Sequence, residues 1–542
     1  MTPALTQRSF LHRLLTNKRD GLMNEAITRP QTGQATDPDT ALFEQPLFQD
    51  PSARALSRVG VVDVGSNSVR LVVFDGAARS PAYFYNEKIM CALGAGLSET
   101  GMLNSAGRVR ALNALKRFQT LADGMGLPTL TVVATAAVRD ASDGPDFCAQ
   151  VERETGMRIW VIDGEEEARL SAQGVLLGWP GSYGLVCDIG GSSMELAEIS
   201  DGRVGRRVTS SLGPLKLRDV KGGKKGRTAH IKETMLKLQE AMGPQRDRLF
   251  LVGGSWRAIA RIDMHRRGYP LHVLHEYRMS ARSISATAKY IAEADLDTLR
   301  HACGISNARM ILVPLAAEVL KRLVKTFRPK DIAISSYGIR EGMLYEQMPQ
   351  RLRDRDPLIE ACRFAEAKDA RMPGFGKALY GFLYPLFKSA PASRRRIIKA
   401  ACLLHDVSWR AHPDYRAETC FDNATRANLG GLKHSERVFM GLALLHRYSN
   451  KRQGTRFDDL VDLIDEQDLQ QAEVLGKAMR FGSMLWMTQD AERGTLRWHP
   501  KKRHLKLTLT PDMVPLYGEV AEARLMSLAA SLNASLEVKT KR

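Results

Sequence analysis

The sequence lacks the cysteine patterns of metal ribbons and of disulfide frameworks. Its seven cysteines are scattered, odd in number and never in C-x-x-C spacing. This argues against a zinc ribbon and a disulfide-stapled fold, and it is typical of a reducing cytoplasm. No apolar run approaches the roughly 18 residues that a membrane span needs. We therefore expect a cytoplasmic protein without a membrane segment.

Acidic residues are few relative to basic ones. The chain has 79 Lys and Arg against 60 Asp and Glu, a formal net charge of +19. Such an excess serves either solubility or attraction to a polyanionic partner, and charge alone leaves both open. At 542 residues the chain is too long for one hydrophobic core, so it predicts several domains.

Hydrophobic periodicity is absent from residues 1–57, which predicts a disordered tail, or a start codon placed too early with Met23 as the true start. Strands then alternate with helices, as expected for two α/β lobes. Amphipathic helices follow, and the chain ends in a small β-hairpin and a helix. The expected boundaries are 58–184 for the first lobe, 185–350 for the second, 357–490 for a helical domain and 491–542 for the C-terminal domain.

Local patterns add detail to the first lobe. A helix is expected from about Asn104 to Gly126, and a strand from Leu130 through ATAAVRD. The buried face of that helix is expected to hold Val109, Leu112, Leu115, Phe118 and Leu121. In the second lobe, KGGKKGR from Lys221 reads as a flexible basic loop.

One pattern occurs twice: a valine-rich strand, an Asp, a Gly turn with hydroxyl residues, and a second strand. The copies are VVDVGSNSVRLVVFDG, from Val61, and LVCDIGGSSMELAEISDG, from Leu185. Each ends in an Asp-Gly hairpin signal, Asp75-Gly76 and Asp201-Gly202. Such turns bring backbone N–H groups to an anion, and the strand-end carboxylates can hold a cation. The repeat predicts two similar lobes that close a phosphate and metal site between them.

Six blocks extend this pattern: VVDVGSNSVRL, ATAAVRDA, GEEEARL, CDIGGSSMEL, LVGGSWRAIA and SSYGIREGML. In this order they resemble the signature blocks of the exopolyphosphatase/guanosine-pentaphosphate phosphatase family, in the actin/Hsp70/sugar-kinase superfamily. The resemblance is strong over about 58–347 and looser in the helical part. It implies an α/β fold with two ribonuclease H-like (actin-like) lobes, a helical HD-like domain and a small α+β C-terminal domain. It also implies a homodimer.

The resemblance implies a phosphate site built on the two repeats. Asp63 and Asp188 would face each other with Mg²⁺ between them, although each Asp could instead only cap its turn. Arg70 could bind phosphate in bidentate fashion or be an exposed strand cation. N–H and hydroxyl donors to the terminal phosphates would come from Gly65, Ser66, Asn67, Ser68, Gly190, Gly191, Ser192 and Ser193.

Glu165 is the candidate general base, at a helix N-terminus beside the cleft. The alternative is an acid favoured there by the helix dipole alone. Arg139 could contact phosphate or pair with Asp140 or Glu165. Ala136 replaces a second glutamate found in some members of the family, and Glu195 could assist the metal or be structural.

Two further features bear on the reaction. Trp256 and Arg257 replace the small residues usual after the Gly-Gly-Ser turn, where relatives in the superfamily hold adenosine, so we expect an occluded or reshaped nucleoside site. His405-Asp406 resembles the metal pair of HD phosphohydrolases, but no histidine occurs in 356–404, which favours a degenerate HD-like domain. Its basic face (Arg394, Arg395, Arg396 and Lys399) could extend a polyanion channel or be solvated.

These observations predict a cytoplasmic Mg²⁺-dependent exopolyphosphatase that hydrolyses inorganic polyphosphate and has neither DNA nor a membrane as partner. The nearest alternative is hydrolysis of guanosine pentaphosphate (pppGpp) by the same site. A non-catalytic sensor of phosphate compounds is an alternative of another class, and a sugar-kinase-like phosphotransferase is a third.

Overall fold

The first lobe is built on a five-stranded sheet with the strand order β3-β2-β1-β4-β5. The structure is a computed structural model that describes residues 55–244, 247–450, 457–485 and 494–541. β1 runs antiparallel to β2 and parallel to β4. The strands are β1 (Ala55–Val64), β2 (Ser68–Ala77), β3 (Ser80–Met90), β4 (Thr131–Ala134) and β5 (Ile159–Val161).

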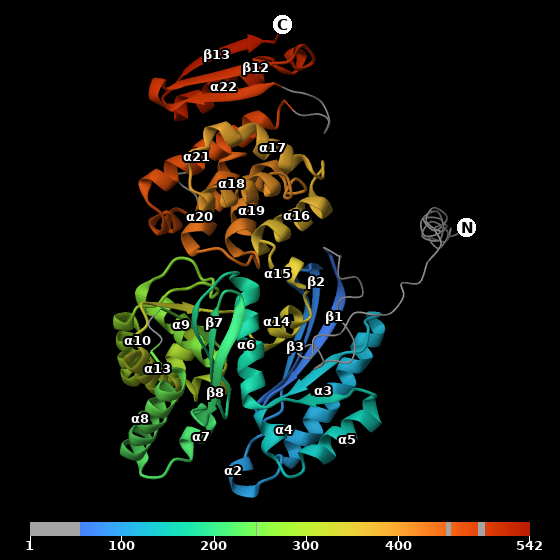
Figure 1. The fold of residues 1–542 in the computed structure, drawn as a ribbon, viewed down its shortest axis with the longest axis vertical. Coiled ribbons are helices and arrows are strands. Elements are labelled where there is room, and N and C mark those ends of the chain that lie inside the picture. The colour runs from blue at the N-terminus through green and yellow to red at the C-terminus, as the bar shows by residue number, and fades with distance from the viewer. Residues whose placement is uncertain (1–54, 245–246, 451–456, 486–493, 542) are drawn as a thin grey trace, which may run out of the picture. The chain divides into compact units, whose positions relative to one another are not determined.

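Both faces of β1 are covered, which explains its unbroken run of valines. Val61, Val62 and Val64 are fully buried. One face packs against α3 (Ser105–Gly124) and α5 (Gly144–Thr155), seen beside the blue strands in Figure 1.

The second lobe repeats this topology, with the order β10-β9-β6-β7-β8. β6 takes the place of β1, and the antiparallel and parallel pairings correspond strand by strand. The predicted pair of similar lobes is confirmed. The strands are β6 (Gly184–Ile189), β7 (Met194–Ser200), β8 (Arg203–Ser210), β9 (Arg248–Val252) and β10 (Asp331–Ile334). The helices are α7 (Pro214–Arg218), α8 (Gly223–Met242), α9 (Gly254–Arg267), α10 (Ala281–Glu293), α11 (Leu296–Ala302), α12 (Asn307–Met310) and α13 (Val313–Phe327).

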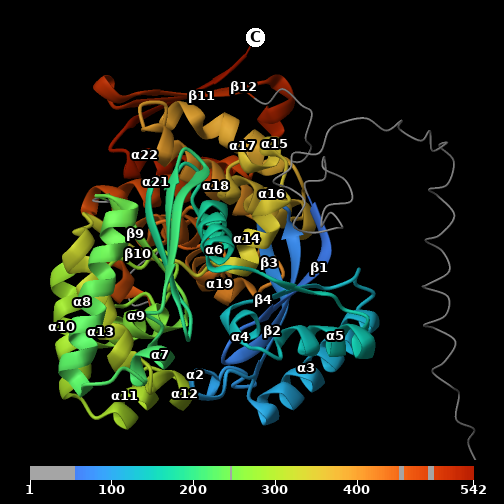
Figure 2. The same ribbon diagram turned by 60° about the horizontal axis from the view of Figure 1, so that its bottom comes forward.

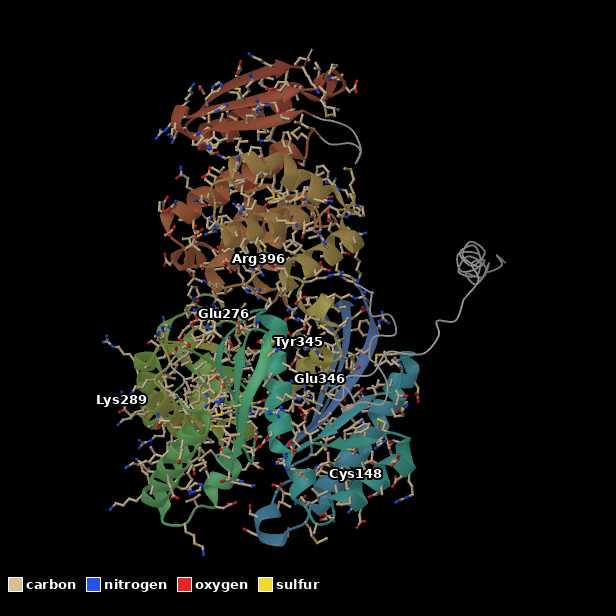
Figure 3. All side chains as sticks on the ribbon, in the orientation of Figure 1. Cys148, Glu276, Lys289, Tyr345, Glu346 and Arg396 are labelled. Carbon is tan, nitrogen blue, oxygen red and sulfur yellow. The ribbon has the colours of Figure 1, made fainter. Side chains whose placement is uncertain are left out.

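Two helices, α6 (Gly164–Gly178) and α14 (Ile339–Glu346), pack against each other between the two sheets (Figures 1 and 2). Their close approach depends on glycine. A Cβ on Gly342 would lie 1.8 Å from the Leu170 carbonyl oxygen. An ion pair of 2.5 Å between Arg169 and Glu346 also joins the two helices. Figure 3 labels Glu346.

Helices dominate the chain from α16 onward, and they share one hydrophobic core with the C-terminal domain. They are α16 (Pro357–Asp369), α17 (Phe375–Leu383), α18 (Ala392–Leu404), α19 (Pro413–Arg426), α20 (His434–His446) and α21 (Glu466–Gly482). The C-terminal elements are β11 (Thr495–His499), β12 (His504–Leu509), α22 (Glu519–Ser531) and β13 (Ser535–Thr540). Among the described helices, none has the length and apolarity that crossing a lipid bilayer requires.

The structure corrects several local predictions. The expected tail lies outside the described residues up to residue 54, but Ala55 already begins β1. Val109 is 59% exposed, and the buried face of α3 is completed by alanines instead. The strand from Leu130 ends at Ala134, and a short helix, α4 (Ala136–Asp140), follows. The prediction of a flexible basic loop from Lys221 is wrong, because α8 begins at Gly223. The expected hairpin and helix at the C-terminus are present, but β13 adds a strand parallel to β12.

Candidate active site

The two repeats form the same turn. The Gly65 N–H donates to the Ser68 carbonyl at 3.1 Å, and the Gly190 N–H donates to the Ser193 carbonyl at 3.0 Å. Each turn follows a strand whose second-last residue is the predicted aspartate. Both turns lie at the carboxyl ends of central strands, where ligands bind in α/β folds. The repeat therefore builds two matching loops, the ones predicted to bind phosphate.

The two loops meet in one cleft of about 180 Å³. Across it the Ser192 hydroxyl donates to the Ser66 hydroxyl at 3.2 Å. The structure places eleven of the thirteen predicted site residues on the wall of this cleft: Asp63, Gly65, Ser66, Asn67, Ser68, Arg70, Asp188, Gly190, Gly191, Ser192 and Ser193.

Asp63 and Asp188 form the acidic part of the cleft. Burial raises the pKa of the Asp63 carboxyl, and the nearby Arg340 opposes this rise. Burial likewise raises the pKa of Asp188, and a hydrogen bond that Ser171 donates to its carboxylate opposes the rise. Two partly buried carboxylates whose charged forms are disfavoured suit a divalent cation, whose charge stabilises both. No group of three or more metal-ligating side chains occurs among the described residues.

Gly253 keeps this acidic part open. Its φ is +110°, a conformation that L side chains rarely adopt. A Cβ there would lie 2.9 Å from the Asp188 carboxylate and 2.6 Å from the Ile189 carbonyl oxygen. Gly253, which joins β9 to α9, therefore lets these two elements approach the second phosphate loop.

Glu167, not Glu165, faces the cleft. The Glu165 side chain is exposed in the first turn of α6, whereas Glu167 is buried and lines the cleft. The prediction that Glu165 lies at the cleft is wrong, because two positions along a helix turn the side chain by about 200°. No local pattern selects Glu167 from the three consecutive glutamates. Only the folded helix places it on the face of Ser171, four residues on, whose hydroxyl donates to Asp188.

Glu167 and Glu195 form a second buried carboxylate pair. One oxygen of each, Oε2, has no hydrogen-bond partner in the described part of the chain. Burial is the main cause that raises the pKa of Glu167 well above its usual range, and the charges of Glu195 and Asp188 add to it. Burial and then Asp188 raise the pKa of Glu195 to about 8. A carboxylate held this way is a stronger base than a solvated one.

Arg139 does not line the cleft, so the predicted phosphate contact is not present. Its guanidinium donates to the Ile162 carbonyl at 3.0 Å and to Asp140 at 3.2 Å. It also lies 3.9 Å from Glu167 Oε2. Arg139 therefore contacts the buried glutamate rather than the space in which a ligand would lie.

Four cations on the cleft wall were not predicted as ligand-binding residues. With Arg70 they form a basic wall from five elements, and they are Lys88 of β3, Arg257 of α9, Arg309 of α12 and Arg340 of α14. Burial, followed by the charges of these arginines, lowers the pKa of Lys88 to about 8. In Arg340, which is 8% exposed, Nε and Nη1 have no hydrogen-bond partner among the described residues. The wall therefore favours an anion in the cleft.

Trp256 does not occlude this cleft. The indole is fully buried in the core of the second lobe and does not line the cleft, so the prediction that it occludes a ligand site is wrong for this cleft. The neighbouring Arg257 lines the cleft instead.

Comparison with known families settles the relationship. The Ppx/GppA phosphatase family matches residues 72–351, a range that begins just after the first loop and includes the second. The chain belongs to this family. The domain described as "Exopolyphosphatase, C-terminal" matches residues 386–538.

The names of individual relatives of this chain indicate different roles. Retrograde regulation protein 2 of Saccharomyces cerevisiae is 24% identical over 445 residues, 74% of each chain. Exopolyphosphatase 1 of Mycobacterium tuberculosis is 34% identical over 143 residues, 26% of this chain and 42% of that protein. An exopolyphosphatase structure from Cytophaga hutchinsonii shares the fold at 23% identity and a TM-score of 0.50, over 54% of this chain and 98% of that one.

The His405-Asp406 pair has structural partners within the helical domain. The Asp406 carboxylate accepts two hydrogen bonds from the Arg371 guanidinium, at 2.6 and 2.9 Å. His405 Nδ1 lies 2.9 Å from the Cys402 carbonyl. Both carboxylate oxygens of Asp406, which would be the metal ligands of an HD site, therefore accept hydrogen bonds from an arginine.

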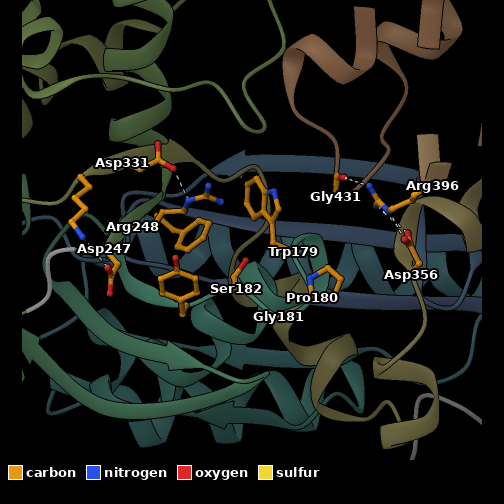
Figure 4. A pocket seen from close by; sticks show the side chains of 13 residues that line it. Trp179, Pro180, Gly181, Ser182, Asp247, Arg248, Asp331, Asp356, Arg396 and Gly431 are labelled. Carbon is orange, nitrogen blue, oxygen red and sulfur yellow. Dashed lines mark hydrogen bonds and ion pairs between the residues drawn. The ribbon is translucent and has the colours of Figure 1, made fainter. Parts of the chain in front are cut away.

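A second pocket, with a volume of about 560 Å³, lies beside Trp179 (Figure 4). Its charged side chains pair with one another: Arg248 with Asp331 at 2.7 Å, and Arg396 with Asp356. Because these cations already have carboxylate partners, the cleft between the phosphate loops remains the candidate active site.

Proposed function

We propose that this chain is an exopolyphosphatase, which hydrolyses the terminal phosphoanhydride bond of inorganic polyphosphate and releases orthophosphate. One observation carries the proposal: a single cleft holds both repeated loops, a basic wall and a buried glutamate, one oxygen of which has no hydrogen-bond partner in the described structure. The basic wall suits a substrate that is charged along its whole length.

The two loops and the glutamate would have different roles in the reaction. Backbone N–H groups and hydroxyls of the two loops would donate to the terminal phosphate and to the charge that develops in the transition state. Glu167 would take a proton from a water molecule that attacks the terminal phosphorus, and Arg139 would hold the glutamate in place. The leaving group is the shortened polyphosphate, whose new terminal oxygen Arg340 could neutralise.

Mg²⁺ fits the oxygen donors of Asp63 and Asp188. Magnesium is usually bound by one or two carboxylates together with substrate phosphates and water, so a site without three protein ligands is consistent with it. When bound, the ion would neutralise phosphate charge and polarise the bond to be broken.

A second function is supported by the relative in yeast. Retrograde regulation protein 2 matches most of this chain and is named as a regulator, so a non-catalytic phosphate sensor is the alternative. The carboxylates Asp63, Asp188 and Glu167 on the cleft wall support catalysis instead, because a binding protein for anions gains nothing from acids in its cleft.

Orthophosphate release from long-chain polyphosphate and from guanosine pentaphosphate, with Mg²⁺ or with EDTA, tests the proposal. We expect rapid release from polyphosphate with Mg²⁺, slow release from the nucleotide, and none with EDTA. Asp188→Asn should lose activity while it still binds the phosphate chain. Tight polyphosphate binding by the wild type without release in Mg²⁺ would favour the sensor and contradict the enzyme.

A further inference from the structure

Three cations line the cleft without belonging to the predicted phosphate loops. Lys88 comes from the first lobe, and Arg257 and Arg309 come from the second. The Arg257 guanidinium is held by two backbone carbonyls, donating from Nε to Gly253 and from Nη1 to Ser336, each at 3.2 Å. These bonds orient the group while leaving it without a carboxylate at hydrogen-bonding distance in the described structure.

Arg309 occupies the turn that precedes α9. A Cβ on Gly254 would lie 2.5 Å from the Arg309 guanidinium carbon, and Arg309 Nη1 lies 3.5 Å from the Ser255 hydroxyl. The glycine therefore makes room for an arginine side chain. An aromatic base cannot occupy the same space.

The size of the cleft points the same way. Its 180 Å³ is well below the roughly 300–1,000 Å³ of pockets that enclose a drug-sized ligand. A linear phosphate chain is narrow and carries charge at every unit, so it can use cations that lie beyond the terminal group. In a nucleotide bound by its terminal phosphate, the neutral sugar and base would take the place of the inner phosphates and could not pair with these cations.

We propose that Lys88, Arg257 and Arg309 form a second anion subsite, which binds inner phosphates of a linear polyphosphate and excludes a nucleoside. The inference rests on the proposed function, since it assigns the chain that extends from the hydrolysed end. Because its residues come from both lobes, an occupied subsite would also bridge them.

Chain-length dependence of binding tests the subsite. Pyrophosphate, tripolyphosphate and long-chain polyphosphate are titrated calorimetrically into the wild type, Arg257→Met and Arg309→Met in EDTA, with orthophosphate assayed afterwards to show that each ligand is intact. We expect each variant to lose about ten- to hundredfold in affinity for long-chain polyphosphate, as for a lost charge-assisted hydrogen bond. Affinity for pyrophosphate should stay within about twofold.

Two controls separate the subsite from general charge and from folding. Arg282→Ala removes one positive charge from an exposed position of α10 and should bind all three ligands as the wild type does. Arg257→Lys keeps the charge and should recover part of the affinity for long chains.

Equal losses for pyrophosphate and for long chains in Arg257→Met would overturn the subsite. So would guanosine pentaphosphate binding to the wild type as tightly as a polyphosphate of equal charge. The proposed function fails separately, if the wild type with Mg²⁺ releases no orthophosphate from polyphosphate while the chain-length dependence persists.

Discussion

Lys88 stands among four arginines, and its charge depends on what the cleft holds. Burial is the main cause that lowers the pKa of this lysine to about 8, and Arg309, Arg70, Arg257 and Arg340 add to it. A bound polyanion stabilises the ammonium form, so the pKa of Lys88 should rise on binding. The free protein therefore has to take up a proton when the ligand binds above pH 8.

Proton uptake can be measured directly. Since the bound state has the higher pKa, affinity should be constant below about pH 8 and fall as the pH rises above that value. Titration of tripolyphosphate at pH 8.5, in two buffers of different ionisation enthalpy, should give different heats of binding for the wild type. Lys88→Arg should give no uptake at this residue, because arginine stays protonated. Equal buffer dependence in both proteins would contradict the assignment to Lys88.

Some site residues could be predicted from the sequence and others could not. The repeat predicted Asp63, Asp188 and both loops because it is local and occurs twice. Glu167 was missed in favour of Glu165, since three consecutive glutamates offer no local signal and only the packing of α6 selects one face. The basic wall could not be predicted as a unit, because its residues come from five separate elements that meet only in the folded lobes.

At the scale of elements, the hairpins show how tertiary contacts override turn signals. Asp201 and Gly202 have φ of 51° and 74°, and they form the predicted two-residue turn between β7 and β8. The equivalent Asp75-Gly76 lies within β2, and the turn is made three residues later by Ala78 and Arg79. There Arg79 is fully buried and donates to the Leu177 carbonyl at 2.6 Å, near the end of α6. Such a distant partner is invisible in the local sequence.

The contact between α6 and α14 provides a prediction at the same scale. Gly342→Ala should destabilise the protein by about 1–3 kcal/mol, because the new methyl group overlaps the Leu170 carbonyl and forces the helices apart. It should also lower activity, since α6 holds Glu167 and α14 holds Arg340. Thermal unfolding and orthophosphate release measure both effects.

Gly381→Ala is the matched control. This glycine lies in α17, and no atom stands within 4 Å of an added Cβ. The substitution should leave activity unchanged and raise stability by up to about 1 kcal/mol, because alanine is the better helix former. Similar losses in both variants would show that the helix contact is not the cause.

On the scale of the whole molecule, a buried histidine connects the second lobe with the helical domain. His434 of α20 lies 3.1 Å from the His275 carbonyl through Nε2 and 2.8 Å from the Tyr269 hydroxyl through Nδ1. A carbonyl can only accept, so Nε2 carries the proton and Nδ1 accepts from the tyrosine. Burial is the main cause that lowers the pKa of His434 to about 4, and that of His275 to about 3.

These depressed values predict acid sensitivity. In the unfolded chain both histidines titrate near 6.5, so their neutral contacts are fully present above that pH. As the pH falls from about 6.5 to 4, the unfolded state binds more protons than the folded one, and each histidine costs at most about 1.4 kcal/mol of stability per pH unit. The midpoint of thermal unfolding should therefore drop over this range.

His434→Gln separates this effect from general acid denaturation. Glutamine keeps a donor for the carbonyl and has no proton to gain, so the variant should lose less stability than the wild type between pH 6.5 and 4.5. His412→Gln, at an exposed position, should follow the wild type. An unchanged acid dependence in His434→Gln would rule out this histidine as a source.

The most direct test of the account is the rate of orthophosphate release from long-chain polyphosphate by Glu167→Gln and Glu165→Gln, two substitutions of identical chemistry two residues apart. If the cleft hydrolyses polyphosphate with Glu167 as the base, Glu167→Gln should lose about 100- to 10,000-fold in kcat. Glu165→Gln should stay within about twofold of the wild type, since its side chain is exposed. Full activity in Glu167→Gln, or an equal loss in both variants, would contradict the account.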